Sequence, residues 1–328
     1  MEATRQGLQP ASFERFSRLL LSLPELANST LPHFDLRASK PILDSASMKP
    51  HDWLRLAYEV AANYDRYDGF LLLVGTDTMS YAASALSFFL ENIRKPVIIT
   101  GAQYPLHQSG GDAPANLWGA LQVLQQAEGL FEVAIYFNGL LIRGNRADKV
   151  SDTEIGAIIS PRFPALGWLT NGVLSLRQHL LLPAPQELFA PASLVRDLPR
   201  VSYLRLFPGL ESQLLKFALS SHIQGLILET YGTGNIPGDD DLLDALECAC
   251  NNDIIVVSTT QCLRGRVHMD RYNVGYRLRE VGVIGGSDMT TAAAYTKLIY
   301  LLGKRYAPVD VRRLIPVDMR GELTEEHL

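Results

Sequence analysis

The residues best suited to chemistry stand together in the pentapeptide Gly75-Thr76-Asp77-Thr78-Met79. It directly follows an apolar run, Phe70 to Val74, that predicts a buried strand. In open parallel sheets, ligand sites form at the carboxyl ends of strands. Two hydroxyls and a carboxylate are therefore expected at the mouth of a sheet. The alternative is that these side chains only cap the next helix, although a cap needs just one of them.

Lys149 is a candidate base for this hydroxyl chemistry and closes the segment RGNRADK (143–149). A threonine hydroxyl is a poor nucleophile until another group takes its proton. A lysine buried beside a hydroxyl can be driven neutral and accept that proton. In this interpretation Thr76 donates, Lys149 accepts and Asp77 binds a cation. The alternative is an ordinary solvated lysine, and the two arginines of the segment are expected to pair with carboxylates.

A second polar segment, Gly101-Ala102-Gln103, also follows an expected strand, Val97–Thr100. It leads into a loop rich in Gly, Ser and Gln, His107 to Asp112. By itself this pattern is more typical of a flexible strand-to-helix connection with a helix cap at Asp112. His107 is interpreted as a surface histidine. His33, His51 and His268 are scattered along the chain without metal-ligand spacing, so we expect no metal site.

The composition is that of an ordinary soluble globular protein, with 47% hydrophobic and 20% charged residues among 328. The net charge of −5 is spread along the chain without a Lys/Arg block, which argues against nucleic acid as a partner. Three sparse cysteines, Cys248, Cys250 and Cys262, are interpreted as reduced thiols. No signal peptide or membrane span is recognised, so we expect a cytoplasmic protein without a membrane partner.

Leu-, Val- and Ile-rich runs alternate with helix-like segments in the first half of the chain. Strands that are apolar throughout are buried on both faces, and helices between them imply parallel pairing. We therefore predict an α/β fold with a doubly wound, mostly parallel, Rossmann-like sheet. The expected strands are Phe70–Val74, Val97–Thr100 and Val133–Phe137, and the expected helices are Tyr81–Glu91 and Ala115–Gln126, besides a packed helix at Leu19–Leu23.

A proline-rich stretch from Leu182 to Arg200 indicates a domain boundary. We predict an N-terminal domain at 1–183, a linker at 184–200 and a second, smaller α/β domain at 201–328. In the second domain the expected strands are Val201–Leu206, Gly225–Glu229 and Ile254–Ser258, and the expected helices are Asp240–Asn251 and Thr290–Gly303.

Taken together, these segments resemble the L-asparaginase family, and most closely its cytoplasmic type I bacterial members. GTDTM followed by SALSFFLEN and then TGAQ is a specific combination, and the resemblance covers essentially the whole chain. The matching segments, in chain order, are LDSASM (43–48), DGFLLLVGTDTMSYAASALSFFLEN (68–92), KPVIITGAQYPL (95–106), RGNRADK (143–149), YGTGN (231–235), TTQCLRG (259–265), GVIGGSDMT (282–290) and RGELT (320–324).

The resemblance implies hydrolysis of L-asparagine to L-aspartate and ammonia without a cofactor. It implies a homodimer or homotetramer whose sites are shared between subunits. Thr76, Asp77 and Lys149 match the family's hydroxyl–carboxylate–lysine set. Asp44-Ser45-Ala46 matches the turn that holds the α-amino and carboxylate groups of the substrate, and Asn235 matches a residue that reaches the partner's site.

The amino-terminal region departs from the family pattern. Family members begin with a strand ending in a TGGTI-like turn, whose second threonine is the covalent nucleophile. Here Met1 aligns just after that turn, and Leu8 replaces the tyrosine usual in the following QGY-like context. We expect roughly fifteen residues, about one strand and its exit loop, to be encoded upstream. The 1–328 chain alone is then expected to be poorly active or unstable.

A second departure concerns regulation. The resemblance implies an effector site around an R-S-Y turn and a T-Q-C turn. The first turn reads Glu229-Thr230-Tyr231 here, while Thr260-Gln261-Cys262 is retained. Because Glu229 replaces a positive charge that would bind an effector carboxylate, we expect the response to be lost or changed.

Two further readings stay open beside the asparaginase interpretation. One is a catalytically silent relative that binds amino acids or a partner subunit. Leu8 and Glu229 favour it, whereas the retained Thr76, Asp77 and Lys149 oppose it. The other is an amidase subunit that releases ammonia from glutamine for a tRNA amidotransferase, which would normally carry an additional N-terminal domain. The preference between asparagine and glutamine is left open by the residues, since one methylene contributes only about 1–3 kcal/mol in a pocket.

Overall fold

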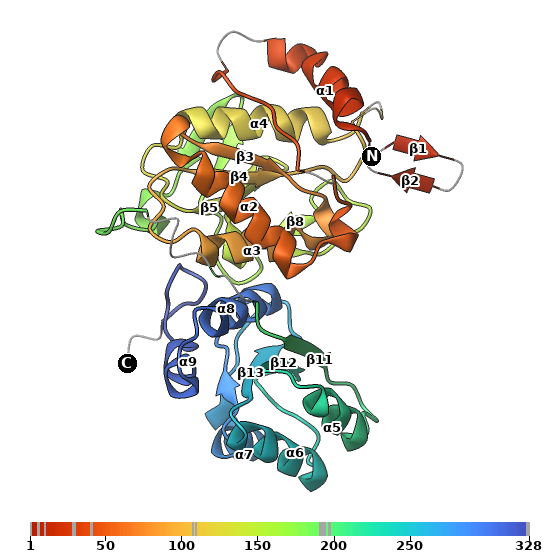
Figure 1. Cartoon of the computed structure of the whole chain (residues 1–328), viewed down its shortest axis with the longest axis vertical. Helices are drawn as coiled ribbons and strands as arrows, with labels where there is room; N and C mark the ends of the chain where they lie inside the picture. The colour runs from red at the N-terminus through yellow and green to blue at the C-terminus, as the bar shows by residue number, and fades with distance from the viewer. Residues whose placement is uncertain are drawn as a thin grey trace. The chain divides into compact units, whose positions relative to one another are not determined.

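The structure is a computed structural model that describes residues 2–4, 7–9, 11–27, 31–39, 42–106, 108, 110–189, 195 and 198–325. His107 lies outside the described residues. The chain divides into two compact units, Met1–Leu194 and Val195–Leu328, and each contains its own sheet. Figure 1 draws the first unit in red to green and the second in green to blue. The division falls inside segment 184–200, whose role as a linker stays a prediction.

The sheet of the first unit is mixed, with order β10-β9-β6-β5-β4-β3. Its strands β3, β4 and β5 run parallel, whereas the pairs β5–β6, β6–β9 and β9–β10 are antiparallel. The polar segments that follow β3 and β4 therefore leave the same edge of the sheet. The strands are β3 (Phe70–Leu73), β4 (Val97–Thr100), β5 (Val133–Phe137), β6 (Leu140–Arg143), β9 (Gly167–Thr170) and β10 (Val173–Leu176).

Helices cover both faces of this sheet, with α4 on one face and α2 and α3 on the other (Figure 1). Nearly every residue of α3 is buried, and its Ala and Ser residues allow close approach of the neighbouring backbone. The first unit contains α1 (Phe13–Leu21), α2 (Pro50–Ala62), α3 (Met79–Phe89), α4 (Ala113–Gln126) and the short pairs β1 (Glu2–Thr4) with β2 (Gly7–Gln9) and β7 (Asp148–Lys149) with β8 (Ile158–Ile159).

Burial differs along the parallel strands of the first unit. All residues of β4 and β5 are buried, as the sequence predicts. The prediction is wrong for β3, whose residues are only partly buried and whose Leu73 is 40% exposed. The reason is topological, because β3 is the edge strand among the described residues and pairs only with β4.

The second unit contains a four-stranded parallel sheet in the order β11-β12-β13-β14. The helices α5, α6 and α7 cover one face, where Leu226, Leu228 and Val256 form an apolar core with them. The helix α8 packs on the other face (Figure 1). The elements are β11 (Val201–Arg205), α5 (Ser212–Ser220), β12 (Gly225–Thr230), α6 (Asp240–Asn251), β13 (Ile255–Thr260), α7 (Asn273–Glu280), β14 (Ile284–Gly285), α8 (Thr291–Gly303) and α9 (Pro308–Leu314).

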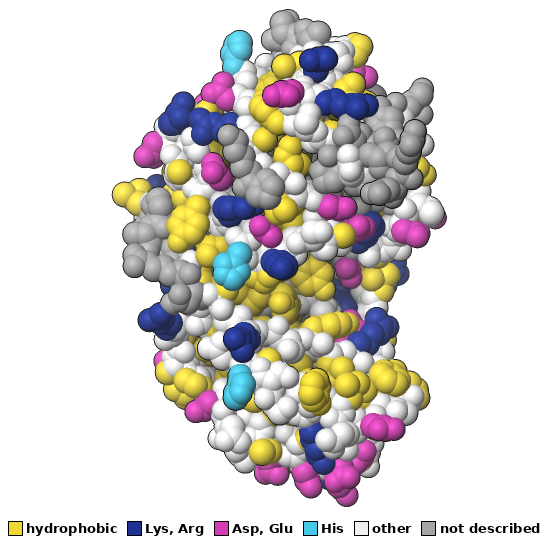
Figure 2. Space-filling model, turned by 45° about the vertical axis from the view of Figure 1, so that its right-hand side comes forward, with side chains coloured by type: hydrophobic (Ala, Val, Ile, Leu, Met, Phe, Trp, Pro, Cys, Tyr) yellow, Lys and Arg dark blue, Asp and Glu magenta, His cyan; other side chains and the backbone are white. Residues whose placement is uncertain are grey.

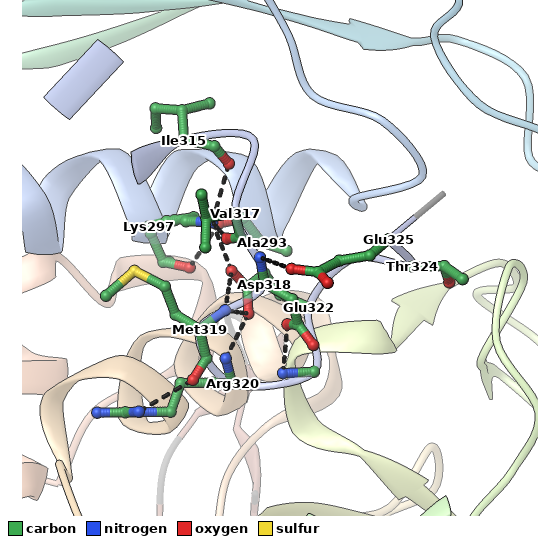
Figure 3. Close-up of polar contacts among 12 residues, drawn as sticks. Ala293, Lys297, Ile315, Val317, Asp318, Met319, Arg320, Glu322, Thr324 and Glu325 are labelled. Carbon is green, nitrogen blue, oxygen red and sulfur yellow. Dashed lines mark hydrogen bonds and ion pairs between the residues drawn. The ribbon is translucent and has the colours of Figure 1, made fainter. Parts of the chain in front are cut away.

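A fully buried ion pair holds the carboxyl-terminal segment of the second unit onto α8 (Figure 3). The Lys297 ammonium lies 2.5 Å from Oε1 of Glu322 and also donates to the carbonyl oxygens of Ile315 and Val317. The Glu322 carboxylate further accepts from the backbone N–H groups of Met319 and Arg320. Both charged groups are therefore hydrogen-bonded, as burial requires.

The predicted α/β class is confirmed, and most predicted elements agree with the structure within two residues at each end. Charged side chains of both signs are interspersed on the face drawn in Figure 2, in line with the mixed charge of the sequence. Within the described ranges, no helix is both long and apolar enough to cross a bilayer.

Candidate active site

Two glycines at the exits of neighbouring parallel strands shape the candidate site. A Cβ atom on Gly75, after β3, would lie 2.5 Å from Oγ of Ser45. A Cβ atom on Gly101, after β4, would lie 2.2 Å from the carbonyl oxygen of Val74. Both contacts are too short for a side chain: at Gly75 the obstacle is the Ser45 side chain, and at Gly101 it is the backbone, which only glycine can approach so closely. The short 3-10 helix that follows β3, Thr76–Thr78, is thereby held against the turn Ser45–Ser47.

The hydroxyl of Thr76 is in contact with the predicted lysine. Lys149 Nζ lies 2.9 Å from Thr76 Oγ1 and 2.6 Å from Asp77 Oδ1. The Lys149 side chain is 19% exposed and that of Asp77 is 59% exposed, while Thr76 is buried. The structure therefore brings together the three residues that the sequence analysis combined, and Lys149 itself is the cation bound by Asp77.

Lys149 is fixed by the segment that precedes it. The 3-10 helix Gly144–Arg146 is buried and leads into β7, which ends at Lys149. Arg143, just before this helix, forms a buried ion pair with Glu132, with 2.5 Å between Nε and Oε2. The expectation that the arginines of this segment are structural is confirmed for Arg143.

The alternative that the GTDTM residues merely cap α3 is wrong. Thr78 occupies the N-cap position, but no side-chain capping hydrogen bond forms there. Its hydroxyl instead donates to the carbonyl oxygen of Ser45 at 2.8 Å. The Asp44 carboxylate accepts from the N–H of Ala46 and shapes the Asp44-Ser45-Ala46 turn. This turn therefore lies beside the hydroxyl–lysine pair.

Gln103 belongs to the same cluster, although the sequence analysis interpreted its segment as a connection. The Thr76 hydroxyl donates to Gln103 Oε1 at 2.8 Å. Asp112 is not the expected side-chain cap of α4, because its carboxylate makes no capping bond there. It accepts instead from the backbone N–H groups of Gln103 and Tyr104, both at 3.0 Å. A polar residue following Gly at the exit of a second parallel strand is the signal that could have found Gln103.

The remaining candidate residues lie in the second unit. Asn235 closes the turn that begins at Tyr231, with backbone hydrogen bonds in both directions between these residues. Thr230 and Thr260 are buried at the carboxyl ends of β12 and β13. The N–H of Cys262 donates to the Thr260 hydroxyl, and the Gln261 side chain donates to the carbonyl oxygens of Leu206 and Glu229. These six effector candidates, Glu229, Thr230, Tyr231, Thr260, Gln261 and Cys262, thus lie at one end of one sheet.

The Glu229 carboxylate is buried within a set of donors from its own unit. Tyr203 Oη donates to Glu229 Oε2 at 2.7 Å, and Thr291 Oγ1 donates to Oε1 at 3.0 Å. Arg205 Nη1 lies 3.3 Å from Oε2. The sign of this charge is evident from the sequence, but its three partners are not, because they come from β11 and α8.

The fold and the cluster around Thr76 together define an α/β protein with a hydroxyl, an amine and a carboxylate at the carboxyl end of a parallel sheet. Such a set can deliver a hydroxyl oxygen to a carbonyl carbon while the amine takes its proton. Among the described residues, His, Cys, Asp and Glu side chains form no group of three or more that could hold a metal ion.

Comparison with known proteins assigns the family. Residues 1–182 match the family described as "Asparaginase, N-terminal", and residues 200–315 match "Glutaminase/Asparaginase C-terminal domain". "L-asparaginase 1" of Escherichia coli (strain K12) is 39% identical over 99% of this chain and 95% of its own length. The crystal structure of L-asparaginase I from Vibrio cholerae is 38% identical with a TM-score of 0.86, covering 96% of this chain and 93% of that one.

A further solved structure, the thermostable L-asparaginase from Thermococcus kodakarensis, is 31% identical with a TM-score of 0.85 and covers 99% of this chain and 96% of its own. The chain belongs to the L-asparaginase family and is an amidohydrolase of that family.

Proposed function

We propose that this chain hydrolyses L-asparagine to L-aspartate and ammonia by two-step acyl transfer through the Thr76 hydroxyl, in place of the poor activity expected from the sequence of residues 1–328. The observation that carries the proposal is the 2.9 Å contact between Lys149 Nζ and Thr76 Oγ1. Relatives named L-asparaginase, similar over nearly the full chain, support the substrate. We also propose a cytoplasmic homodimer or homotetramer that uses no cofactor.

In the first step, once the Lys149 ammonium has given up a proton, Thr76 Oγ1 attacks the side-chain carbonyl carbon of asparagine and its own proton passes to Lys149 Nζ. The carbon–nitrogen bond then breaks, and the nitrogen leaves as ammonia with the proton returned from Lys149. The contact of 2.6 Å from Asp77 stabilises the transient ammonium. In the second step, water attacks the ester, aspartate is released and the Thr76 hydroxyl is restored.

Substrate positioning is assigned to the turn beside this pair. Asp44, Ser45 and Ala46 lie next to Thr76–Thr78, where a carboxylate and backbone N–H groups can hold the α-amino and α-carboxylate groups of asparagine. Asn235 is proposed to complete the site of a neighbouring subunit. Binding at both ends of the substrate would hold the amide carbon against the hydroxyl, which converts attack into an effectively unimolecular step.

Ammonia release from L-asparagine by the purified chain, beside its Thr76→Ala and Thr76→Ser variants, tests the proposal. Thr76→Ala is expected to abolish turnover, and Thr76→Ser is expected to retain part of it because the hydroxyl remains. Undiminished turnover in Thr76→Ala would overturn the assignment. If the unaltered chain is folded but releases no ammonia, the reading as a silent amino-acid-binding relative takes its place, and calorimetric titration with L-asparagine becomes the deciding measurement.

A further inference from the structure

The side-chain amide of Gln103 has one orientation that satisfies its surroundings. Nε2 donates to the carbonyl oxygen of Ser151 at 3.4 Å, while Oε1 lies 2.8 Å from Thr76 Oγ1. The reversed amide would place two carbonyl oxygens against each other at Ser151. Oε1 therefore faces Thr76, and the Thr76 hydroxyl must be the donor.

The direction of this hydrogen bond determines where the Thr76 proton points. A threonine hydroxyl has one proton, and Gln103 accepts it. The oxygen of Thr76 consequently presents its lone pairs elsewhere, one of them toward Lys149 Nζ at 2.9 Å. These two hydrogen bonds together hold Thr76 Oγ1 at one position, and the hydroxyl proton turns from Gln103 Oε1 to Lys149 Nζ when the oxygen attacks.

The backbone that carries Gln103 is held from behind by a buried carboxylate. Asp112 is 5% exposed, and its Oδ2 and Oδ1 each accept an N–H group, from Gln103 and Tyr104 respectively, at 3.0 Å. Asn116, 2% exposed, donates to Asp112 Oδ2 and to the carbonyl oxygen of Gly101. The loop after β4 is therefore anchored at both ends to the first turn of α4.

We propose that Gln103 and Asp112 are positioning residues, in which Asp112 holds the 103–104 backbone so that the Gln103 carbonyl keeps Thr76 Oγ1 in its place beside Lys149 Nζ. The proposal rests on the proposed function, because it assigns a task to residues behind Thr76. Neither residue needs to touch substrate. Loss of either lets the Thr76 side chain leave this position, and misplacement of a reacting atom by about 1 Å can cost about 100-fold in rate.

Two replacements of Gln103 separate the effect of losing its hydrogen-bond acceptor from the effect of losing its side-chain volume. Gln103→Met keeps the shape but has no strong acceptor, and Gln103→Ala removes both. Both variants are expected to lower kcat about 10- to 100-fold with KM changed less than about threefold. Gln224→Met is the matched control, since it makes the same substitution in the second unit and removes only the hydrogen bond that Gln224 Oε1 accepts from the Arg200 N–H. It should keep the kcat of the unaltered chain. A Gln103→Met enzyme as fast as the unaltered one would overturn the proposal.

Asp112→Asn tests whether the contacts of Asp112 with the 103–104 backbone are needed. The amide cannot accept on both sides, so one of its backbone partners is released, and kcat should fall as in Gln103→Ala. The double variant Q103A/D112N should be no slower than Q103A alone, because Asp112 is proposed to act through Gln103. If the losses in kcat of the two single variants add in the double variant, Asp112 acts by another route, and the proposal that it acts through Gln103 is rejected.

Crystal structures of the unaltered chain, Asp112→Asn and Gln224→Met give a readout that does not depend on turnover. The Gln103 Oε1 to Thr76 Oγ1 contact should persist in the unaltered chain and in Gln224→Met, and should be lost in Asp112→Asn. Retention of the contact in Asp112→Asn refutes the proposal. If Asp112→Asn does not fold, the proposal is tested by the position of Thr76 Oγ1 and the kcat of Gln103→Met. A chain with these contacts but no turnover would reject the proposed function while leaving the positioning geometry intact.

Discussion

Lys149 is the residue on which the chemistry of the site depends, because a single amine touches both the hydroxyl and the carboxylate. Its contacts are 2.9 Å to Thr76 Oγ1 and 2.6 Å to Asp77 Oδ1. Asp77 is more than half exposed, so its ion pair with Lys149 alone contributes little to folding. Its value lies in holding the amine in line with the hydroxyl and in stabilising the ammonium that forms during attack.

Lys149→Met tests this assignment of the base. Removal of a positioned general base is expected to lower kcat about 100- to 10,000-fold while the substrate-binding turn stays in place. Lys49→Met serves as the control, since Lys49 is exposed and takes no part in the cluster. Steady-state ammonia release gives the kcat values of Lys149→Met and Lys49→Met. Equal kcat values for the two variants would show that the Thr76 proton is accepted by a group other than Lys149.

A second prediction about a single residue concerns Glu229. Its carboxylate already has partners in Tyr203, Thr291 and Arg205, and its negative charge opposes another carboxylate. We therefore expect the initial rate to rise hyperbolically with L-asparagine concentration, with a Hill coefficient of about 1. Sigmoidal kinetics that disappear in Glu229→Ala would mean that an amino-acid effector binds there after all.

The sequence was sufficient to predict the residues of the site whose chemistry is evident from type and place. Thr76, Asp77 and Lys149 were predicted together and lie together. The role of Gln103 could not be predicted from the sequence, because an amide side chain shortly after a glycine is common in loops between a strand and a helix. Its importance comes from a hydrogen bond to a residue 27 positions away. The partners of Glu229 were missed for the same reason, since they meet only after β11 and α8 have packed.

Among the secondary-structure elements, the exits of β3 and β4 set the geometry of the site. At Gly101 an added Cβ would lie 2.2 Å from the Val74 carbonyl oxygen and 2.7 Å from Met79 Cε. The first of these atoms is backbone and cannot move aside cheaply. A side chain at this position would push β4 away from the loop that carries Thr76, or force α3 to shift.

Gly101→Ala is therefore expected to destabilise the first unit by about 1–3 kcal/mol, the usual effect of overpacking. Glu59→Ala is the control, because Glu59 is an exposed residue of α2 in the same unit and the effect of its replacement should stay within about 0.5 kcal/mol. Urea unfolding followed by tryptophan fluorescence measures the first unit, since Trp53, Trp118 and Trp168 all lie in it. A Gly101→Ala midpoint equal to that of the unaltered chain would contradict the steric argument.

Strand and helix positions were largely predictable, because continuous apolar runs identify buried parallel strands without further information. Val97–Thr100, Val133–Phe137 and Asp240–Asn251 agree with the structure at both ends. The exposure of Leu73 was not predictable in this way, since the composition of a strand does not reveal whether it lies at an edge. The antiparallel extension by β6, β9 and β10 was also missed, because polar residues or a glycine interrupt or end the apolar run in each of these strands.

At the scale of the whole molecule, the chain consists of two compact units, and a single unfolding free energy does not describe it. The carboxyl-terminal segment of the second unit depends on a fully buried pair, Lys297 and Glu322, rather than on apolar packing alone. Breaking one partner of such a pair typically costs about 3–5 kcal/mol, whereas replacing both by apolar groups is often neutral. The RGELT motif therefore has a structural role, because Glu322 belongs to it.

This pair makes the second unit sensitive to acid. Burial acts to raise the pKa of the Glu322 carboxyl, but the attraction of Lys297 and the hydrogen bonds to the carboxylate outweigh burial and hold that pKa below its ordinary value of 4.5. A carboxyl whose pKa is lower in the folded state stabilises the fold fully above the ordinary value, and this contribution is lost as the pH falls through the folded value. Protonation then leaves the Lys297 ammonium buried without its counter-charge.

Hydrogen exchange of α8 and of residues 315–325, corrected for intrinsic rates, can follow this loss between pH 7 and pH 3. In the unaltered chain, protection should be constant down to about pH 5 and then fall, in step with carboxyl protonation. In the double variant K297M/E322L the protection should depend much less on pH, and Glu322→Gln should be weakly protected at every pH because Lys297 is left unpaired. The same acid loss in the double variant would mean that other carboxylates, such as Asp288 with its hydrogen bonds to Thr324, control the segment.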